Sequence, residues 1–229
     1  MLQVRPSEER GHNQLSWLDT RFTFSFDQYY DPEHVQFRSL RVLNEDVVTP
    51  SQGFGLHPHR DMEILTWVLD GEIKHRDSTG GEGVVRPGEL QHMSAGTGVM
   101  HSEFNPSPKN PVHLLQIWLT PERKGLKPMY EQLAFSDKEL RGDFYHVAGP
   151  KAAVTIRQDA DLYVARLDTG DSAVRPIAEG RHAWVQVARG KVRVNGVELK
   201  QGDGAAISKD SEVRVEAIDR SEVLLFDLA

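Results

Sequence analysis

Short stretches typical of β-strands recur along almost the whole chain and limit the folds that it can adopt. They are rich in Val, Ile, Leu and aromatic residues, and turns that contain Gly, Pro, Asp or Asn separate them at close intervals. Such spacing is typical of a β-sandwich or β-barrel. We expect strands at residues 22–26, 40–44, 64–69, 112–119, 163–167, 185–188, 191–195, 212–217 and 223–228. A short helix is expected at residues 131–142, with a start signal at Ser136-Asp137 inside it.

The two halves of the chain contain the same order of features. The first half has TWVLDGEIKH, then RPGELQHMS, then HLLQIWL, and the second has VQVARGKVRV, then KQGDGAAIS, then EVLLFDL. Each half gives a strand, a glycine, a strand, a turn with Gly and an acidic residue, a further strand and a final apolar strand. A repeat of this kind predicts two stacked β-barrels, joined where turn and polar residues cluster at residues 142–161.

Composition and charge exclude several classes of protein. Hydrophobic residues make up 38% of the 229 residues and charged residues 27%, which is typical of a globular chain. The lack of cysteine excludes disulfides, a zinc ribbon and a thiol nucleophile. A net charge of −7 without a dense Lys/Arg stripe argues against nucleic-acid binding. With no long apolar run and no signal sequence, we expect a cytoplasmic protein without membrane contact.

Two pairs of residues are candidate metal ligands. His57 and His59 are two residues apart, and so are His101 and Glu103. Residues two apart on a strand project from the same face, so each pair can point into one barrel interior. If the two strands are neighbours, three imidazoles and one carboxylate converge. Nitrogen and oxygen ligands without sulfur suit Fe(II), Mn, Ni, Cu, Co or Zn.

The segments around these pairs are similar to cupin motifs. The first pair lies in GFGLHPHRDMEILTWVLDG and the second in RPGELQHMSAGTGVMHSEFN. A general cupin takes its carboxylate from the first motif, which here would be Glu63, whereas in this chain a His-x-Glu unit ends the second motif. Together with RGHNQLSWLDTRFTFSFDQYYDP and HLLQIWLTP, this pattern resembles the pirin family over nearly the whole chain. Within that family the chain is most similar to the bacterial pirin-like proteins described as quercetin 2,3-dioxygenases.

The resemblance implies an all-β bicupin, with two stacked double-stranded β-helix (jelly-roll) barrels. It implies an N-terminal metal-binding cupin (pirin) domain at residues 1–145 and a C-terminal cupin-like domain at residues 146–229. One metal ion, with Fe(II) as the first choice, would be held by His57, His59, His101 and Glu103. Glu63 would then lie beside the ligands or face elsewhere from its strand.

The second barrel lacks ligands at the matching positions. Counting back from Gly190 by the spacing between Gly71 and the first pair leads to Pro176 and Ala178. Counting forward from Gly202 by the spacing between Gly88 and the second pair leads to Val215 and Ala217. None of these side chains can bind a metal, so we expect the C-terminal domain to be free of metal.

For function, the resemblance implies an oxidoreductase that cleaves flavonols such as quercetin at the 2,3 bond with O2 and releases carbon monoxide. Glu103 is the candidate catalytic residue that accepts the substrate proton, and Glu63 is the alternative. Pirin relatives are also described as redox-sensing regulatory proteins that act through a protein partner, and this alternative needs the same four ligands. A third alternative is another metal-dependent cupin enzyme, such as an isomerase. We expect a monomer.

The remaining histidines are expected to be packed or surface residues, since a lone histidine is seldom a ligand. These are His12, His34, His75, His113, His146 and His182. His92 lies between the PGE turn and the AGTG loop and is expected nearer to the pocket. Trp67 and Trp118 alternate with apolar neighbours, so both are expected in the core.

Overall fold

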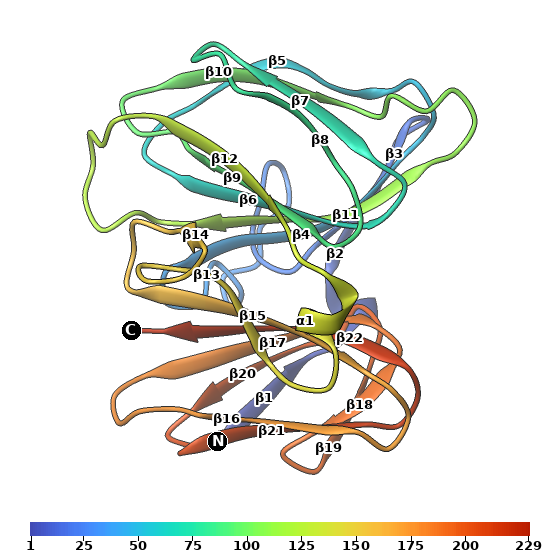
Figure 1. The fold of residues 1–229 in the computed structure, drawn as a ribbon, viewed down its shortest axis with the longest axis vertical. Coiled ribbons are helices and arrows are strands. Elements are labelled where there is room, and N and C mark those ends of the chain that lie inside the picture. The colour runs from blue at the N-terminus through green and yellow to red at the C-terminus, as the bar shows by residue number, and fades with distance from the viewer. The chain divides into compact units, whose positions relative to one another are not determined.

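The computed structural model describes the whole chain, residues 1–229, and consists almost entirely of β-strands, as predicted (Figure 1). The chain forms two compact units. The N-terminal unit comprises residues 11–134 and 156–158, and the C-terminal unit comprises residues 1–10, 135–155 and 159–229. No helix is long and apolar enough to cross a lipid bilayer.

The N-terminal unit contains one seven-stranded and one four-stranded antiparallel sheet. The order of the larger sheet is β12-β9-β6-β11-β4-β3-β2, and that of the smaller sheet is β5-β10-β7-β8. The strands are β2 (Gly11–Gln14), β3 (Leu18–Phe22), β4 (Leu40–Val48), β5 (Gly53–His59), β6 (Glu63–Asp70), β7 (Ile73–Asp77), β8 (Glu82–Val85), β9 (Glu89–Ser94), β10 (Val99–Phe104), β11 (Val112–Leu119) and β12 (Met129–Ala134).

The C-terminal unit also has a seven-stranded and a four-stranded sheet, in the orders β1-β20-β17-β22-β15-β13-β14 and β16-β21-β18-β19. All neighbouring strands in them are antiparallel except β13 and β14, which are parallel. Its helices are the 3-10 turn η1 (Ser7–Glu9) and α1 (Asp137–Leu140). Its strands are β1 (Leu2–Arg5), β13 (Tyr145–Gly149), β14 (Val154–Thr155), β15 (Ala160–Leu167), β16 (Ser172–Pro176), β17 (His182–Arg189), β18 (Lys191–Val194), β19 (Val197–Lys200), β20 (Gly204–Ser208), β21 (Glu212–Ala217) and β22 (Ser221–Leu228). The internal repeat predicted from the sequence is therefore present as two cupin-type units.

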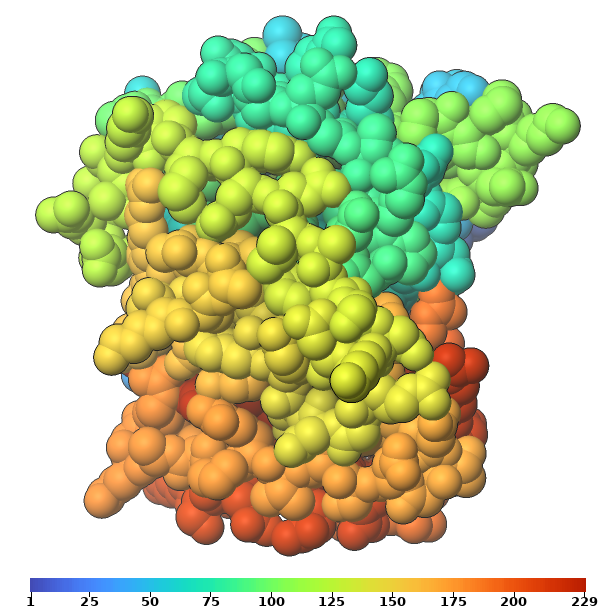
Figure 2. Space-filling model, in the orientation of Figure 1, coloured from blue at the N-terminus to red at the C-terminus, as the bar shows by residue number.

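The interiors of the two units differ in chemistry. Eighteen buried apolar residues, including Val192, Val215 and Val223, form one core cluster in the C-terminal unit. In the N-terminal unit, a smaller apolar cluster with Val68 and Leu114 is accompanied by buried His, Glu and Gln side chains. In the space-filling view of Figure 2, residues 11–134 are coloured from blue to yellow-green and residues 135–229 from yellow to red. Buried Glu and Gln side chains also occur in the C-terminal unit, but the buried histidines, His75, His92 and His101, all lie in the N-terminal unit.

Two segments depart from the sequence-based expectation. Residues 129–134 form β12, which pairs residue by residue with β9, so the expected helix at residues 131–142 is reduced to Asp137–Leu140. Its start signal is confirmed, because the Ser136 side chain accepts a hydrogen bond from the Glu139 N–H and the Glu139 carboxylate accepts one from the Ser136 N–H. Strand β3 ends at Phe22, so residues 23–26 are not the strand that we expected.

Candidate metal centre

Three histidines meet on the inner face of the four-stranded sheet. His57 and His59 belong to β5, and His101 lies on the neighbouring strand β10, paired with His57. Their ring centroids are 4.4 to 4.8 Å apart, and each ring offers a nitrogen within 4.8 Å of the others. Strand alternation therefore brings both histidines of the first pair to one member of the second pair.

The hydrogen bond of His57 determines which of its nitrogens is free. Nδ1 of His57 lies 2.7 Å from the carbonyl oxygen of Gly55, which can only accept, so Nδ1 carries the proton. Nε2 of His57 then has a free lone pair, and it lies 2.9 Å from Nε2 of His101. Two nitrogens that bind one ion at right angles, each about 2.1 Å from it, are about 3 Å apart. The two Nε2 atoms are thus spaced as ligands of one cation.

The electrostatic environment keeps two of these imidazoles neutral. Burial, together with the neighbouring His101 and His57, lowers the pKa of His59 to about 4, although the charge of Glu103 acts to raise it. Burial, together with His57 and His75, lowers the pKa of His101 to about 3. The neutral imidazole is the form that binds metal ions, so both rings are ready to do so at neutral pH.

Glu103 is held beside this group by two amide side chains. Its Oε1 accepts a hydrogen bond from Gln91 Nε2 at 3.1 Å, and its Oε2 accepts one from Gln116 Nε2 at 2.6 Å. The pairing of β10 with β5 shifts register between His101 and Glu103. Glu103 joins a second group of potential ligands, with His101 and His75, rather than the group of His57 and His59. The structure therefore brings His57, His59 and His101 into one group. Glu103, the fourth predicted ligand, shares a group with only one of them, His101.

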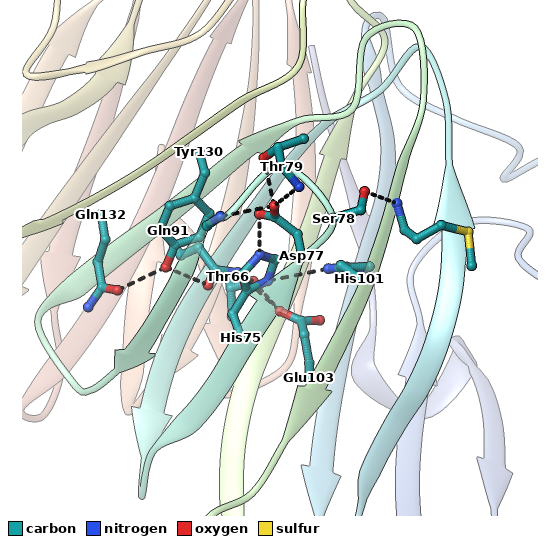
Figure 3. A network of polar contacts seen from close by, with 12 residues as sticks. Thr66, His75, Asp77, Ser78, Thr79, Gln91, His101, Glu103, Tyr130 and Gln132 are labelled. Atoms are coloured by element: carbon teal, nitrogen blue, oxygen red, sulfur yellow. Dashed lines mark hydrogen bonds and ion pairs between the residues drawn. The ribbon is translucent and has the colours of Figure 1, made fainter.

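His75 was expected to be a lone packed or surface histidine, but it contacts a predicted ligand. Its side chain is fully buried, and its Nδ1 lies 3.3 Å from Nδ1 of His101 (Figure 3). Its Nε2 lies 2.9 Å from Oδ2 of Asp77. The sequence signal that was missed is the spacing of His75 and Asp77, which are two residues apart on β7 like the two pairs on β5 and β10.

Asp77 is itself fixed by several donors. Burial raises the pKa of Asp77, but hydrogen bonds from Thr79, His75 and the Gly81 N–H outweigh this and lower the pKa below its ordinary value. The group is therefore a carboxylate, which accepts hydrogen bonds and donates none. Gly81 approaches so closely that a Cβ atom there would lie 2.2 Å from Oδ2 of Asp77.

Glu63 and His92 lie outside the cavity and contact each other. His92 Nε2 is 2.8 Å from a carboxylate oxygen of Glu63, whose second oxygen accepts a hydrogen bond from Ser94. Burial alone would lower the pKa of His92, but the hydrogen bonds and charges of Glu131 and Glu63 have a larger effect, so this pKa is raised. Burial alone would raise the pKa of Glu63, but its contacts with His92 and Ser94 have a larger effect, so this pKa is lowered. Neither residue lines the cavity, so the structure does not support a pocket position for His92 or the role of base for Glu63.

An aromatic cavity of about 430 Å³ adjoins the histidines. This volume lies within the usual range for small organic ligands. Trp118, which we expected in the core, lines the cavity, and its ring meets that of His59 edge-on at 4.8 Å; Trp67 is buried as expected. The cavity is lined by Asn13, Leu15, Trp17, Leu18, Thr20, Phe22, Phe26, Asp27, Asn44, Asp46, Gly53, Phe54, Gly55, His57, His59, Ile64, His101, Glu103, Gln116 and Trp118.

Comparison with known proteins gives matches over both units. The Pirin family model matches residues 3–119, and the model of the quercetinase C-terminal cupin domain matches residues 147–228. A quercetin 2,3-dioxygenase of Escherichia coli K12 is 45% identical over 228 residues, which cover all of this chain and 99% of that protein. A putative quercetin 2,3-dioxygenase of Pasteurella multocida is also 45% identical, with both chains fully covered.

Solved structures agree with these matches. The crystal structure of YhhW from Escherichia coli superimposes with a TM-score of 0.96 at 46% identity and covers all of this chain and 98% of its own. The structure of this bacterial pirin in complex with nickel(II) gives a TM-score of 0.94 at 46% identity, with 100% and 99% of the two chains covered.

Proposed function

Since this chain belongs to the pirin family, we propose that it is a metal-dependent dioxygenase that uses Fe(II) and O2 to cleave flavonols. The substrate class is represented by quercetin, which would be cleaved at the 2,3 bond with release of carbon monoxide. The observation that carries this proposal is the pair of Nε2 atoms of His57 and His101, 2.9 Å apart, at the wall of an aromatic cavity. The nickel(II) complex of the related bacterial pirin supports one metal ion per chain.

His57, His59, His101 and Glu103 would hold the ion. The first three already form one group, and the protonated Nδ1 of His57 leaves its Nε2 free to ligate. Each carboxylate oxygen of Glu103 has two lone pairs, so the amides of Gln91 and Gln116 orient this group without using all its acceptor capacity. The donor set of nitrogen and oxygen without sulfur suits non-haem iron and also nickel.

The residues of the chain account for binding and for proton transfer. A bound ferrous ion with open positions supplies electron transfer to O2 and lowers the pKa of a substrate hydroxyl. Phe26, Phe54 and Trp118 give the cavity apolar walls that suit the flat rings of a flavonol and exclude water. Glu103 would accept the proton of the 3-hydroxyl group, a role supported by its position in the lining of the same cavity and next to His101 on β10.

We further propose that metal binding is confined to the N-terminal domain at residues 1–145, and that the domain at residues 146–229 is free of metal. By sheet order, β16 and β21 of the C-terminal unit correspond to β5 and β10. The positions that match the ligands hold Pro176, Ala178, Val215 and Ala217, and the last two belong to the apolar core. These side chains offer no donor atom to a cation.

The test is anaerobic reconstitution of metal-free protein with Fe(II), followed by admission of O2 and measurement of quercetin absorbance and carbon monoxide. His57→Ala is measured in parallel. Saturable cleavage that requires Fe(II) and is lost in His57→Ala is the expected result. No cleavage by protein that carries one Fe(II) per chain would refute the dioxygenase proposal and favour redox-dependent binding of a protein partner.

A further inference from the structure

We propose that His75 and Asp77 are positioning residues for the metal centre, which fix the proton of His101 on Nδ1 and so direct the lone pair of Nε2 to the ion. This inference rests on the proposed role of His101 as a ligand. It assigns a task to two buried side chains on β7 that do not line the cavity.

The hydrogen bonds of Asp77 determine which nitrogen of His75 carries a proton. Its Oδ1 accepts hydrogen bonds from the Thr79 N–H at 2.7 Å, the Thr79 hydroxyl at 2.6 Å and the Gly81 N–H at 3.0 Å. Its Oδ2 remains for Nε2 of His75, 2.9 Å away. A carboxylate only accepts, so Nε2 of His75 carries the proton and Nδ1 of His75 has the lone pair.

The lone pair on Nδ1 of His75 in turn determines which nitrogen of His101 carries a proton. Nδ1 of His75 can accept the proton of Nδ1 of His101, 3.3 Å away (Figure 3). His101 is then protonated on Nδ1, and its Nε2, 2.9 Å from Nε2 of His57, is left as a donor atom for a cation. Hydrogen bonding of the second ring nitrogen commonly sets which nitrogen of a histidine ligand binds the metal.

Packing keeps the His75 ring in this orientation. His75 is fully buried and stacks on Tyr130, with ring centroids 4.7 Å apart and an interplanar angle of 18°. The Tyr130 hydroxyl contacts Gln91, the residue that also donates to Glu103. One side of the network therefore holds His101 and the other holds Glu103, the two candidate ligands on β10.

A competing arrangement makes His75 itself a ligand, because His75, His101 and Glu103 also form a possible metal group. In that arrangement the ion binds Nδ1 of both histidines, and His57 is dispensable. All three side chains of that group are buried, and two of them already have hydrogen-bonding partners outside the group: Asp77 for His75, and Gln91 and Gln116 for Glu103. His57, His59 and His101 all line the cavity where a substrate can reach them, whereas His75 does not.

The first experiment uses Asp77→Asn and two readouts that do not depend on turnover. The asparagine amide can donate to Nε2 of His75, which moves the His75 proton to Nδ1 and the His101 proton to Nε2, where the ion would bind. Long-range ¹H–¹⁵N NMR of the metal-free protein reports the protonated nitrogen of each histidine, and calorimetry with Ni²⁺ reports affinity. We expect His101 to change from the Nδ1–H to the Nε2–H form and the Ni²⁺ Kd to rise by about 10- to 100-fold.

A second pair of variants separates positioning from structural support and works even if Asp77→Asn does not fold. In His75→Gln, the side-chain amide can donate to Asp77 while its carbonyl accepts from Nδ1 of His101, so Ni²⁺ affinity should be retained. His75→Phe preserves the stacking on Tyr130 but removes the acceptor, so affinity should fall. Glu131→Gln is the matched control, because Glu131 lies 3.2 Å from the buried His92 outside the cavity, and it should leave Ni²⁺ affinity unchanged.

Two results would overturn the proposal. One is an unchanged His101 proton position together with unchanged Ni²⁺ affinity in Asp77→Asn. The other is complete loss of Ni²⁺ in both His75→Gln and His75→Phe while His57→Ala still binds the ion, which would make His75 a ligand. Because both readouts are made without quercetin or O2, failure of the dioxygenase activity would leave them interpretable.

Discussion

Replacing Gln116 with leucine tests whether the amide of Gln116 holds the carboxylate of Glu103. The two side chains are buried, and the contact from Nε2 to Oε2 is 2.6 Å, shorter than the 3.1 Å contact from Gln91. A hydrogen bond to a charged group contributes about 1.5–3 kcal/mol to stability. Leucine has a similar size but cannot donate, so the free energy of unfolding of the metal-free protein should fall by about that amount, 1.5–3 kcal/mol.

The assay is urea unfolding followed by tryptophan fluorescence, since three of the four tryptophans lie in the N-terminal unit. Gln116→Leu is measured in the native chain and in Glu103→Gln, where the charged acceptor is gone. A coupling energy of about 1 kcal/mol or more is expected between the two positions. Thr66→Val is the comparison, because the Thr66 hydroxyl lies 3.4 Å from Glu103 and should couple to it more weakly.

Equal destabilisation by Gln116→Leu in both backgrounds would refute this reasoning. It would mean that Gln116 contributes by packing alone and that its amide does not hold Glu103. In that case the position of the carboxylate beside His101 would need another cause.

Three further predictions concern the metal centre and its surroundings. His57→Ala should lose Ni²⁺ binding and turnover together while retaining its circular dichroism spectrum, because the His57 side chain is only partly buried at the cavity wall. His92→Gln should reduce stability most between about pH 4.5 and 6.5, the ordinary pKa values of Glu63 and His92. Because the pKa of His92 is raised in the folded protein, its contribution to stability is lost as the pH rises through that pKa. Because the pKa of Glu63 is lowered, its contribution is lost as the pH falls through that pKa. The urea midpoints of the variant and of the native chain should therefore become equal at both low and high pH. Gly81→Ala should weaken Ni²⁺ binding in calorimetry, since the new Cβ would lie 2.2 Å from the Asp77 carboxylate and displace it; unchanged affinity would contradict the positioning role.

Features that repeat within a strand could be predicted from the sequence. His57 with His59, and His101 with Glu103, lie two residues apart, and the two-residue period of a strand puts each pair on one face. The turn residues between short apolar runs predicted the all-β fold, and the similarity of the two halves predicted two β-barrels. Such features depend only on neighbouring residues, so they can be recognised in one sequence.

The register between distant strands was decided by the tertiary structure. Pairing of β7 with β10 places His75 opposite Glu103, and this turned an apparently lone histidine into a contact of His101. Gln116 reaches Glu103 from β11 in the other sheet, and no local pattern indicated it.

The face of the sheet to which each side chain of a strand points was also decided only by packing. On β6, Ile64 lines the cavity whereas Glu63 contacts His92 outside it. The carboxylate of the first cupin-like motif therefore points away from the histidines that line the cavity. A shift of one residue would have reversed this, because alternate side chains of a strand point to opposite faces. The sequence by itself determined which residues can bind a metal, and the register of strands far apart in the chain decided which of them meet and which side chains hold them in place.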